Sequence, residues 1–457
     1  MTMIEEALTK TTDTKACVIG PGATEAAAKM FGELFPDAKK AIVIDDPRTR
    51  AVAGEHVIEL LKATGRDVAE HVINPDGSDF HATYAKVEEV REAICGEWGT
   101  GNGERGIVPV AVGSGVINDL TKRACGELDL RYMVVGTAAS MDGYTAYGAA
   151  ITKDGMKQTM GCKAPLGCIV DSAVAAAAPK EMTASGYADL IAKIPAGADW
   201  IIADLIGSEA IHPLAWKLVQ GPLRDTLSNP VGCASGDERE VRKLCEGLVM
   251  SAFAMQAMGS SRPASGTEHQ VAHYWDMEDL AFEGKPVSHG FKVGIGTLAS
   301  TATLEFLLEH DLSKMDVDEK VASWWPSFDD VKATFPSVFP GRPAHVTRAE
   351  LEYAKKFPTK DALRKELTAI RDNWGDLAAK IRAQLMPFDE VKENLKKVGA
   401  PAEPEEIGVT RARFRETFAG VPYMRARYFG ADLVQRVGLM PALLDRLFGA
   451  GGVWEVK

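Results

Sequence analysis

The first 170 or so residues alternate short apolar runs with amphipathic helical patterns, and this alternation constrains the fold more than any other feature of the chain. The apolar runs indicate strands at 16–20, 41–45, 68–73, 107–113, 132–137 and 167–171, and helical patterns lie between them at 23–34, 48–64, 82–96 and 116–126. Strands that alternate with helices form a mostly parallel sheet with helices on both faces. Such a sheet binds ligands at the carboxyl ends of its strands.

Beyond Asp171 the strand pattern nearly stops and long helical patterns follow, at 173–193, 197–220, 238–258, 265–282 and 289–309, with shorter ones to about residue 455. The proline-rich stretch FPSVFPGRPAH, at 335–345, predicts a connector. At 457 residues the chain is longer than one ordinary domain. We therefore predict an α/β domain over residues 1–172 and an all-helical domain over 173–457, with a ligand-binding cleft between them.

The composition is globular, with 46% hydrophobic and 25% charged residues. A net charge of -12 argues against a nucleic-acid partner and against a basic membrane-surface protein. The seven cysteines are scattered without a CxxC pair, which favours reduced thiols. The polar N-terminus lacks the apolar core of a signal peptide, and the apolar runs are too short to span a bilayer. We expect a cytoplasmic protein with no membrane partner.

The strand at 107–113 ends in a glycine-rich turn, VAVGSGVINDLTK, that opens a helix. Gly113 and Gly115 would let the backbone approach a dinucleotide pyrophosphate, and the start of the helix would offer N–H groups to it. Ser114, Asn118 and Asp119 add polar groups in and just beyond the turn. A well-capped turn without a ligand is the alternative.

Two other turns carry candidate ligand contacts. Asp46 follows the second strand, where an acidic residue commonly binds an adenosine ribose, although a helix cap explains it nearly as well. In VVGTAASMDGYTAYGAAI, at 134–151, small side chains would let a flat ligand lie against the backbone, and Asp142 can accept hydrogen bonds from hydroxyl groups. The turn GPGA, at 20–23, lacks the third glycine of the dinucleotide fingerprint and is weak support for a second nucleotide loop.

Three of the nine histidines fall in two stretches about twenty residues apart, SGTEHQVAHYWD and KPVSHGFKVG. His269 and His273 are four residues apart, so on a helix both imidazoles share one face. Imidazole is the commonest protein ligand for a transition metal and also a near-neutral acid–base group. Together with Glu268 and His289, the set favours a metal or catalytic site over isolated surface or capping histidines.

Five motifs, in order along the chain, resemble those of sn-glycerol-1-phosphate dehydrogenases, members of the iron-containing alcohol dehydrogenase and dehydroquinate synthase superfamily. They are GSGVINDLTK, TAASMDGYTAYGAA, ASGYADLIAK, SRPASGTEHQVAH and VSHGFKVGIGTL. The resemblance runs from about residue 15 to the C-terminus, and the stretch MPFDEVKENLKKVGAPAEPEEIGVTRARF is similar to the bacterial branch. The fold that it implies is a dinucleotide-binding α/β domain followed by an all-helical metal-binding domain.

The resemblance implies a role for each matching residue. The turns described above already predict Asp46, Gly113 and Ser114 as cofactor contacts, and the resemblance implies Gly115, Asn118, Asp119, Thr137, Ala138, Ala139 and Ser140. Of these, the turn after the fourth strand would lie along the pyrophosphate, and the four residues from Thr137 would line the nicotinamide. Relatives often place a serine where this chain has Ala146, which leaves one family contact to the cofactor open.

The metal ligands implied by the resemblance are Asp189, His269 and His289. Asp142, Asp189 and His273 would bind substrate, and Asp189 and His273 would be catalytic. A carboxylate with two imidazoles leaves metal positions open for substrate, and it suits zinc, nickel or iron.

The implied reaction is the reversible, metal-dependent reduction of dihydroxyacetone phosphate to sn-glycerol 1-phosphate by NADH or NADPH. Asp46 disfavours the 2′-phosphate of NADP and Arg48 could accept it, so both cofactors stay open. The family also implies a homo-oligomer, with a dimer favoured.

Three alternatives stay open at this point. The chain could be a glycerol or polyol dehydrogenase of the same superfamily, a dehydroquinate synthase-like lyase, or a non-catalytic sugar-phosphate-binding relative. The ligands of the substrate phosphate also stay open. Lys193, Lys292 and Arg262 lie on suitable segments, although each alone is more simply a solvated or structural cation.

Overall fold

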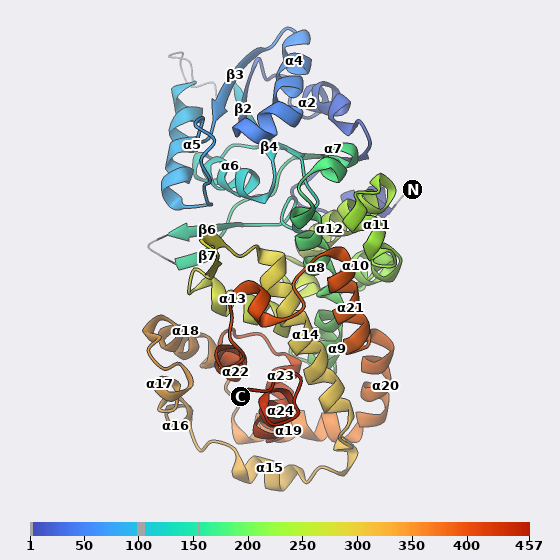
Figure 1. Ribbon diagram of the computed structural model, residues 1–457, viewed down its shortest axis with the longest axis vertical. Coiled ribbons are helices and arrows are strands. Elements are labelled where there is room, and N and C mark those ends of the chain that lie inside the picture. Colours follow the sequence, from blue (N-terminus) through green and yellow to red (C-terminus); the bar gives the residue numbers. More distant parts are fainter. Residues whose placement is uncertain (1–2, 98–105, 154–155) are drawn as a thin grey trace. The chain divides into compact units, whose positions relative to one another are not determined.

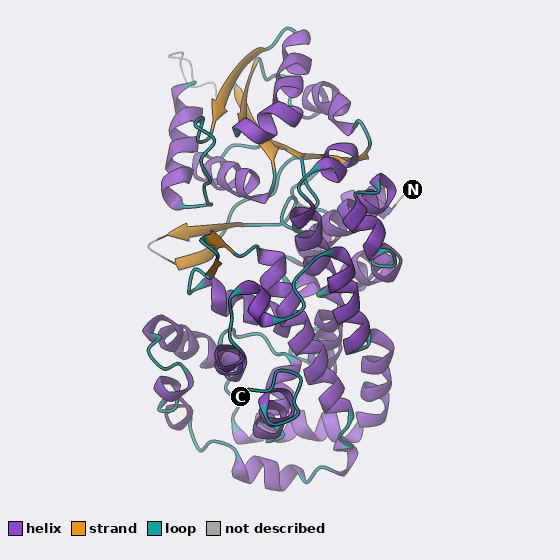
Figure 2. Cartoon of the chain, viewed as in Figure 1, coloured by secondary structure: helices purple, strands orange, loops and turns teal. Residues whose placement is uncertain are grey.

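The computed structural model describes residues 3–97, 106–153 and 156–457 (Figures 1 and 2). The chain forms two compact units, each assembled from several segments. The first unit comprises Met1–Leu190, Leu214–Ser261 and Lys397–Gly399, and the second comprises Ile191–Pro213, Arg262–Lys396 and Ala400–Lys457. The sequence-based division at residue 172 marks the end of the parallel sheet at Asp171, whereas each compact unit is discontinuous along the chain.

The first unit is built on a six-stranded sheet with the order β1-β8-β5-β4-β2-β3, in which every neighbouring pair is parallel. The strands are β1 (Ala16–Gly20), β2 (Lys40–Asp45), β3 (Asp67–Val72), β4 (Ile107–Gly113), β5 (Met133–Gly136) and β8 (Gly167–Asp171). These are the six predicted strands, so the predicted α/β class is confirmed. Every residue of β4, β5 and β8 is buried, and a strand buried on both faces is visible in sequence as an unbroken apolar run.

Helices cover this sheet in the order that the sequence predicts. They are η1 (Ala23–Ala26), α2 (Ala27–Leu34), α3 (Pro47–Thr49), the π-helical turn η2 (Arg50–Gly54), α4 (Glu55–Ala63), α5 (Tyr84–Gly96) and α6 (Gly115–Leu128). Phe31 of α2 and Val57 of α4 share one core with alternate strand residues such as Val43 and Val110. Because alternate residues of a strand point to one face, α2 and α4 cover one side of the sheet.

A β-hairpin before the last strand was not predicted. β6 (Ala149–Lys153) pairs antiparallel with β7 (Met156–Met160) in a separate two-stranded sheet. The residues between them, Asp154 and Gly155, lie outside the described residues, but Asp-Gly between two short runs is a hairpin signal. Ala149 and Ile151 are buried and Ala150 and Thr152 less so, and this short alternation is too weak a pattern to stand out.

The helices that complete the first unit are α1 (Met3–Leu8), α7 (Ser172–Ala177), α8 (Lys180–Ile191), α10 (Pro213–Thr226), α11 (Pro230–Ser235) and α12 (Glu238–Met258). The prediction of one helix at 173–193 is wrong, because Pro179 separates α7 from α8 and proline disfavours helix in the residue before it. The predicted helix at 197–220 is divided as well. Gly207 adopts a φ of 70° after α9 (Lys193–Leu205), and the next helix begins at Pro213.

The second unit is helical, as predicted. Besides α9 it contains η3 (Arg262–Ala264), α13 (Thr267–Asp276), α14 (His289–Leu308), η4 (Leu312–Lys314), α15 (Val317–Ser323), α16 (Phe328–Lys332), α17 (Phe335–Val338), α18 (Pro343–Tyr353), α19 (Lys360–Asp372), α20 (Trp374–Gln384), α21 (Phe388–Val398), η5 (Pro404–Ile407), α22 (Arg411–Gly420), η6 (Val421–Tyr423), α23 (Gly430–Arg436) and α24 (Met440–Phe448). The predicted connector at 335–345 contains α17 and the start of α18.

The predicted helix at 265–282 ends early, at Asp276. Asp279 and Glu283 have left-handed backbone conformations, with φ of 46° and 51°, and the chain forms the short hairpin β9 (Ala281–Phe282) and β10 (Lys285–Pro286) instead. This hairpin turns the chain from α13 into α14.

The central helix of the second unit is α14, which packs against α13. It is long and apolar enough by composition to cross a membrane, but 83% of its apolar window is buried inside the protein, which marks a core helix. A Cβ added to Gly296 of α14 would lie 2.3 Å from the backbone oxygen of Glu268 in α13. Only glycine fits this contact.

Replacing Gly296 by alanine should therefore lower the free energy of unfolding by about 1–3 kcal/mol, because the new methyl group forces α13 and α14 apart. Thermal denaturation of the Gly296→Ala protein would show the loss as a lower Tm. Gly375→Ala in α20 is the matched control, since nothing lies within 4 Å of its Cβ position. Equal losses of stability in the two variants would contradict the role given to this contact.

Candidate active site

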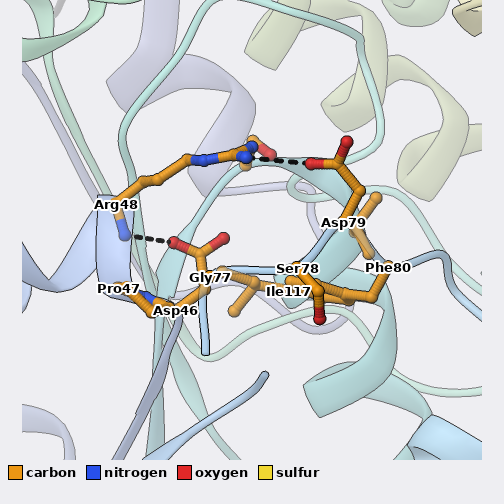
Figure 3. A pocket seen from close by; sticks show the side chains of 10 residues that line it. Asp46, Pro47, Arg48, Gly77, Ser78, Asp79, Phe80 and Ile117 are labelled. Atoms are coloured by element: carbon orange, nitrogen blue, oxygen red, sulfur yellow. Dashed lines mark hydrogen bonds and ion pairs between the residues drawn. The ribbon is translucent and has the colours of Figure 1, made fainter. Parts of the chain in front are cut away.

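A pocket opens at the carboxyl ends of β2 and β4 in the first unit (Figure 3). These strands are neighbours in the sheet, and the chain leaves β2 toward β3 on one side but returns to β4 on the other. This reversal is the topological switch point, where open α/β sheets bind their ligands. The pocket is lined by Asp46, Pro47, Arg48, Gly77, Ser78, Asp79, Phe80, Ser114, Val116 and Ile117.

Asp46 lies in this pocket and also caps a helix, so both sequence interpretations describe it. Its Oδ1 accepts hydrogen bonds from the backbone N–H groups of Arg48 (2.9 Å) and Thr49 (2.8 Å). The Arg48 guanidinium extends across the pocket to Asp79, with 2.9 Å between Nη2 and Oδ1 (Figure 3). The preceding residue, Asp45, is fully buried, and burial raises the pKa of its carboxyl to about 8.

The turn between β4 and α6 forms another wall of the pocket. Ser114 is the N-cap of α6, and its side chain makes no capping hydrogen bond. The first N–H groups of a helix lack intrahelical partners, so the start of α6 suits an anion such as a pyrophosphate. A Cβ on Gly113 would lie 2.5 Å from Ile117 Cδ1 and 2.9 Å from Ile117 Cβ, so this position has no room for a side chain, whereas a Cβ on Gly115 would meet only the flexible end of Met141, at 2.8 Å.

Asn118 and Asp119, the other two predicted cofactor residues of this turn, hold the chain that follows β5. The Asn118 amide donates to the carbonyls of Gly143 (3.4 Å) and Tyr144 (3.3 Å), and Asp119 Oδ2 accepts from the N–H of Ala150 (3.1 Å). The structure therefore gives both side chains a supporting role in shaping the loop.

The buried ammonium of Lys122, one turn further along α6, adds to this support. It donates to the carbonyl oxygens of Gly143 (2.9 Å), Gly148 (3.0 Å) and Ala146 (3.2 Å) and lies 3.3 Å from Asp119 Oδ1. Three carbonyls that lack regular secondary-structure partners thus converge on one cation.

The small-residue stretch after β5 runs beside the glycine turn. The N–H of Thr137 donates to the carbonyl of Gly113 (3.2 Å), and the side chain of Thr137 is buried together with Ala138 and Ala139. Ser140 is partly exposed, and its carbonyl accepts from Ser185 Oγ (3.2 Å). This stretch presents backbone and small side chains beside the loop, as the sequence predicts for a flat ligand.

Asp142 and Asp189, the two acidic residues predicted to contact substrate, are neighbours in the first unit. The N–H of Asp142 donates to Asp189 Oδ2 (3.1 Å), and Asp142 Oδ2 accepts from Ser251 Oγ (2.8 Å). Asp189 is fully buried in the last turn of α8. Ser251 was not predicted, because a single serine within the long helix α12 carries no sequence signal.

The three predicted histidines lie close together in the second unit. The ring centroids of His269 and His289 are 5.5 Å apart, and those of His269 and His273 are 6.3 Å apart. His289 is the first residue of α14, where the preceding Ser288 caps the helix through the N–H of Phe291 (3.3 Å). The pairing of α13 with α14 thus brings the two histidine stretches together.

The fully buried carboxylate of Glu268 orients His269. Glu268 Oε1 lies 2.7 Å from His269 Nδ1 and also accepts from the N–H of Gly266 (2.6 Å). A histidine that ligates a metal usually donates its other ring N–H to a carboxylate in this way, which leaves Nε2 as the ligand atom. The arrangement therefore fits a metal site.

His273 occupies a different environment. Its side chain is 40% exposed, and its Nδ1 lies 3.6 Å from Asp276 Oδ2. Desolvation by the surrounding protein atoms lowers the pKa of His273, and the positive charge of Arg425 acts in the same direction, while Asp276 opposes them. Asp276 was not predicted, since its contact with His273 depends on where α13 ends.

Two of the candidate phosphate-binding cations, Lys292 and Arg262, bind other groups of the protein. Lys292 Nζ lies 2.5 Å from Asp276 Oδ1, and both side chains are nearly fully buried. Arg262 is fully buried and donates to the carbonyls of Asp199 (2.6 Å) and Tyr428 (2.9 Å). Both therefore have the structural role that was weighed against a phosphate site. Lys193, the third, is fully buried in α9.

The predicted metal ligands comprise a buried carboxylate, Asp189, in the first unit and two neighbouring imidazoles, His269 and His289, in the second. Hard and borderline divalent cations accept such mixed oxygen and nitrogen donors. The donor set and the carboxylate behind His269 both fit the metal that the resemblance implies.

Comparisons with known proteins agree with this chemistry. A family model described as iron-containing alcohol dehydrogenase matches residues 18–179. The glycerol-1-phosphate dehydrogenase [NAD(P)+] of Halalkalibacterium halodurans is 33% identical over 260 residues, which is 57% of this chain and 63% of that protein. The enzyme of the same name from Methanothermobacter thermautotrophicus is 31% identical over 279 residues, covering 61% of this chain and 75% of that protein.

The same architecture occurs in a solved structure. The crystal structure of glycerol dehydrogenase from Schizosaccharomyces pombe matches with a TM-score of 0.57 and 15% identity, and the match covers 95% of this chain and 91% of that one. At this identity the likeness shows the fold alone. The sequence matches, by contrast, confirm the resemblance drawn from the five motifs, including its bacterial branch. The chain belongs to the glycerol-1-phosphate dehydrogenase family, within the iron-containing alcohol dehydrogenases.

Proposed function

We propose that the protein catalyses the reversible, metal-dependent reduction of dihydroxyacetone phosphate to sn-glycerol 1-phosphate with NADH or NADPH. The observation that carries this proposal is the pair of neighbouring imidazoles, His269 and His289, with the Glu268 carboxylate hydrogen-bonded to His269. The names of the relatives support the same substrate and cofactor. The matched segment spans 63% of the length of the Halalkalibacterium halodurans relative, so the activity of this chain is proposed here in its own right.

In this proposal the cofactor lies in the pocket of the first unit. The start of α6 binds the pyrophosphate through backbone N–H groups. Asp46 binds the adenosine ribose with the carboxylate oxygen that is not used to cap α3. Arg48 is paired with Asp79 on the exposed rim, so its guanidinium must leave that carboxylate before it can bind a 2′-phosphate.

The metal in this proposal is held by Asp189, His269 and His289. When bound, a divalent ion supplies Lewis-acid polarisation of a carbonyl, and reduced nicotinamide supplies a hydride. The chain's own residues position the substrate and handle the proton. Asp142, fixed by its bonds to Ser251 and Asp189, offers a carboxylate to a substrate hydroxyl.

His273 handles the proton in this scheme. Asp276 lies beside Nδ1, and Lys292 holds Asp276 from the other side, so the imidazole directs Nε2 toward the substrate oxygen that gains a proton. A lowered pKa makes imidazolium a stronger proton donor toward a developing alkoxide. The predicted dimeric state and cytoplasmic location stay predictions.

The first test is the reaction itself. Protein reconstituted separately with zinc, nickel or iron(II) should oxidise NADH or NADPH when dihydroxyacetone phosphate is added, and chiral analysis should identify sn-glycerol 1-phosphate. Unphosphorylated dihydroxyacetone should react much more slowly. Formation of the 3-phosphate enantiomer would contradict the proposal, and a preference for dihydroxyacetone would indicate a polyol dehydrogenase.

Replacing each of the two histidines of α13 by alanine should have different effects on metal binding and turnover. His269→Ala removes a ligand, so bound metal measured by elemental analysis should be lost. His273→Ala should retain the metal and lose turnover by about 10²- to 10⁴-fold, the usual contribution of a general acid–base group. Loss of the metal from the His273→Ala protein would show that these roles are wrongly divided.

Glu268→Gln tests the carboxylate behind His269. Because a neutral amide orients the imidazole less strongly, metal affinity should fall about 10- to 100-fold in competition with a chelator. Glu350→Gln is a matched control, since Glu350 pairs with Lys332 in a partly exposed position on α18. Unaltered affinity in the Glu268→Gln protein would mean that Glu268 serves only the packing of α13.

A further inference from the structure

The pocket at the carboxyl ends of β2 and β4 contains a guanidinium that a carboxylate holds. Arg48 extends from α3, and its Nη2 lies 2.9 Å from Oδ1 of Asp79, which follows β3 (Figure 3). The third charged residue of the lining is Asp46. Among the lining residues that the structure describes, two carboxylates thus accompany one guanidinium.

The backbone that carries Arg48 has a fixed conformation. Asp46 Oδ1 accepts hydrogen bonds from the N–H groups of Arg48 (2.9 Å) and Thr49 (2.8 Å), and the N–H of Asp46 donates to Thr49 Oγ1 (3.1 Å). This reciprocal capping box, with Pro47 at the start of the helix, stabilises the first turn of α3. The Arg48 side chain therefore leaves the backbone at a defined point next to Asp46.

The turn that carries Asp79 is also fixed, by hydrogen bonds within it. The N–H of Gly77 donates to the carbonyl of Asn74 (2.8 Å), and Asn74 Nδ2 donates to Ser78 Oγ (3.0 Å). Ser78 donates to Asp76 Oδ1 through its N–H (3.1 Å) and its hydroxyl (2.7 Å). Asp79 is therefore held opposite α3, and Asp76 adds another carboxylate to the same turn.

Other cations near the pocket have carboxylate partners of their own. Arg50, on the turn η2 that follows α3, pairs with Glu55 and with Glu70. Lys86 of α5, which also donates to the turn, lies 2.5 Å from Glu89 Oε2. Each of these cations is neutralised locally, so the lining keeps its excess of carboxylate over guanidinium.

This excess matters for the choice between the two coenzymes. NADH and NADPH differ only at the 2′ position of the adenosine ribose, where NADPH has a phosphate, with a charge of about -2, in place of a hydroxyl. An acidic residue after the second strand binds the hydroxyl, whereas a nearby arginine accommodates the phosphate. In this pocket the charge of Arg48 is already neutralised by Asp79, so Asp46 and Asp79 both oppose a 2′-phosphate.

The exposure of the ion pair sets the size of the effect. The side chains of Arg48 and Asp79 are 72% and 67% exposed. An exposed ion pair changes an equilibrium constant by a factor of about 5 at most. The pair therefore biases the pocket toward NADH without excluding NADPH.

We propose that Asp79 is a specificity-determining residue, which makes the pocket favour NADH over NADPH by pairing with Arg48. This role rests on the proposed NAD(P)H-linked reaction and specifies which coenzyme the protein prefers. It assigns part of the choice to the turn after β3, in addition to the acidic residue that follows β2.

The test is equilibrium titration of the purified protein with NADH and with NADPH, followed by nicotinamide fluorescence without dihydroxyacetone phosphate. The wild-type protein should have the lower Kd for NADH. In Asp79→Asn, the Kd for NADPH should fall about 5-fold, because Arg48 is free to bind the 2′-phosphate. The Kd for NADH should stay within about 2-fold of the wild-type value, since an exposed pair contributes little to a ligand that it does not contact.

A double-mutant cycle shows whether Arg48 is responsible. In the Arg48→Gln background, the change Asp79→Asn should have little effect on the Kd for NADPH. Asp79→Glu should keep the wild-type preference, because it keeps the charge. Asp129→Asn is the matched control and should leave both Kd values unaltered. It makes the same change in an exposed pair, with Lys163 (3.5 Å), at the end of α6 away from the pocket.

An unaltered Kd for NADPH in Asp79→Asn would overturn the inference. An equal gain in NADPH affinity in the Arg48→Gln background would also overturn it, because repulsion by Asp79 alone would then explain the preference. So would wild-type protein that binds NADPH as tightly as NADH. Protein that shows the expected coenzyme preference but fails to reduce dihydroxyacetone phosphate would contradict the proposed function and leave the role of Asp79 intact.

Discussion

The buried carboxylate of Asp199 is the interaction on which the second unit depends. From α9 it accepts hydrogen bonds from the N–H (2.7 Å) and hydroxyl (2.8 Å) of Thr267 and from the N–H of Gly430 (2.7 Å). It thereby provides hydrogen-bond acceptors for backbone N–H groups at the starts of both α13 and α23. Gly266 and Gly430 must lack side chains, since a Cβ on either would lie within 3 Å of this carboxylate, at 2.6 and 2.8 Å.

Burying the Asp199 carboxylate costs free energy, because the charged form loses its hydration. Desolvation and the nearby charge of Glu268 raise the pKa of its carboxyl to about 7, and bonds from Thr267 and Gly430 oppose the shift. A buried charge is tolerated only when it is fully hydrogen-bonded. The helix that carries His269 and the start of α23 thus share one hydrogen-bonded anchor.

The first unit uses a buried charge in the same way. The ammonium of Lys122 donates hydrogen bonds to the carbonyls of Gly143, Ala146 and Gly148. These bonds fix the path of the chain after β5, where there is no strand or helix. In both units, then, one buried charged side chain holds backbone that lies beside candidate functional residues: the chain around Asp142 in the first unit and the start of α13 in the second. Removing either ion would leave several buried polar groups unpaired, which costs far more than the loss of one bond.

The sequence predicted the fold more fully than the site. All six strands of the sheet were predicted. β2, β4, β5 and β8 are largely buried on both faces and leave an unbroken apolar pattern, whereas β1 and β3 are more exposed and were predicted from short apolar runs between helical patterns. The ends of the helices were predicted less accurately than the strands. Asp276 was not predicted as a site residue, because the helical pattern in the sequence continues to residue 282. In the structure the helix ends at Asp276, and Asp279, with a left-handed backbone conformation, turns the chain. Ser251 could not be found either, because its role depends on a contact with Asp142, which is 109 positions away in sequence.

The hydrogen bond between Asp199 and Gly430 joins residues 231 positions apart. During synthesis from the N-terminus, the second unit therefore cannot close until Gly430 has left the ribosome. Until then α14, the most apolar helix of the unit, has no complete core around it and is exposed to non-native contacts. Slow closure of long-range contacts and transient exposure of apolar surface are the conditions under which nascent chains aggregate. Truncation near the C-terminus would thus harm production of the protein before it harmed any chemistry.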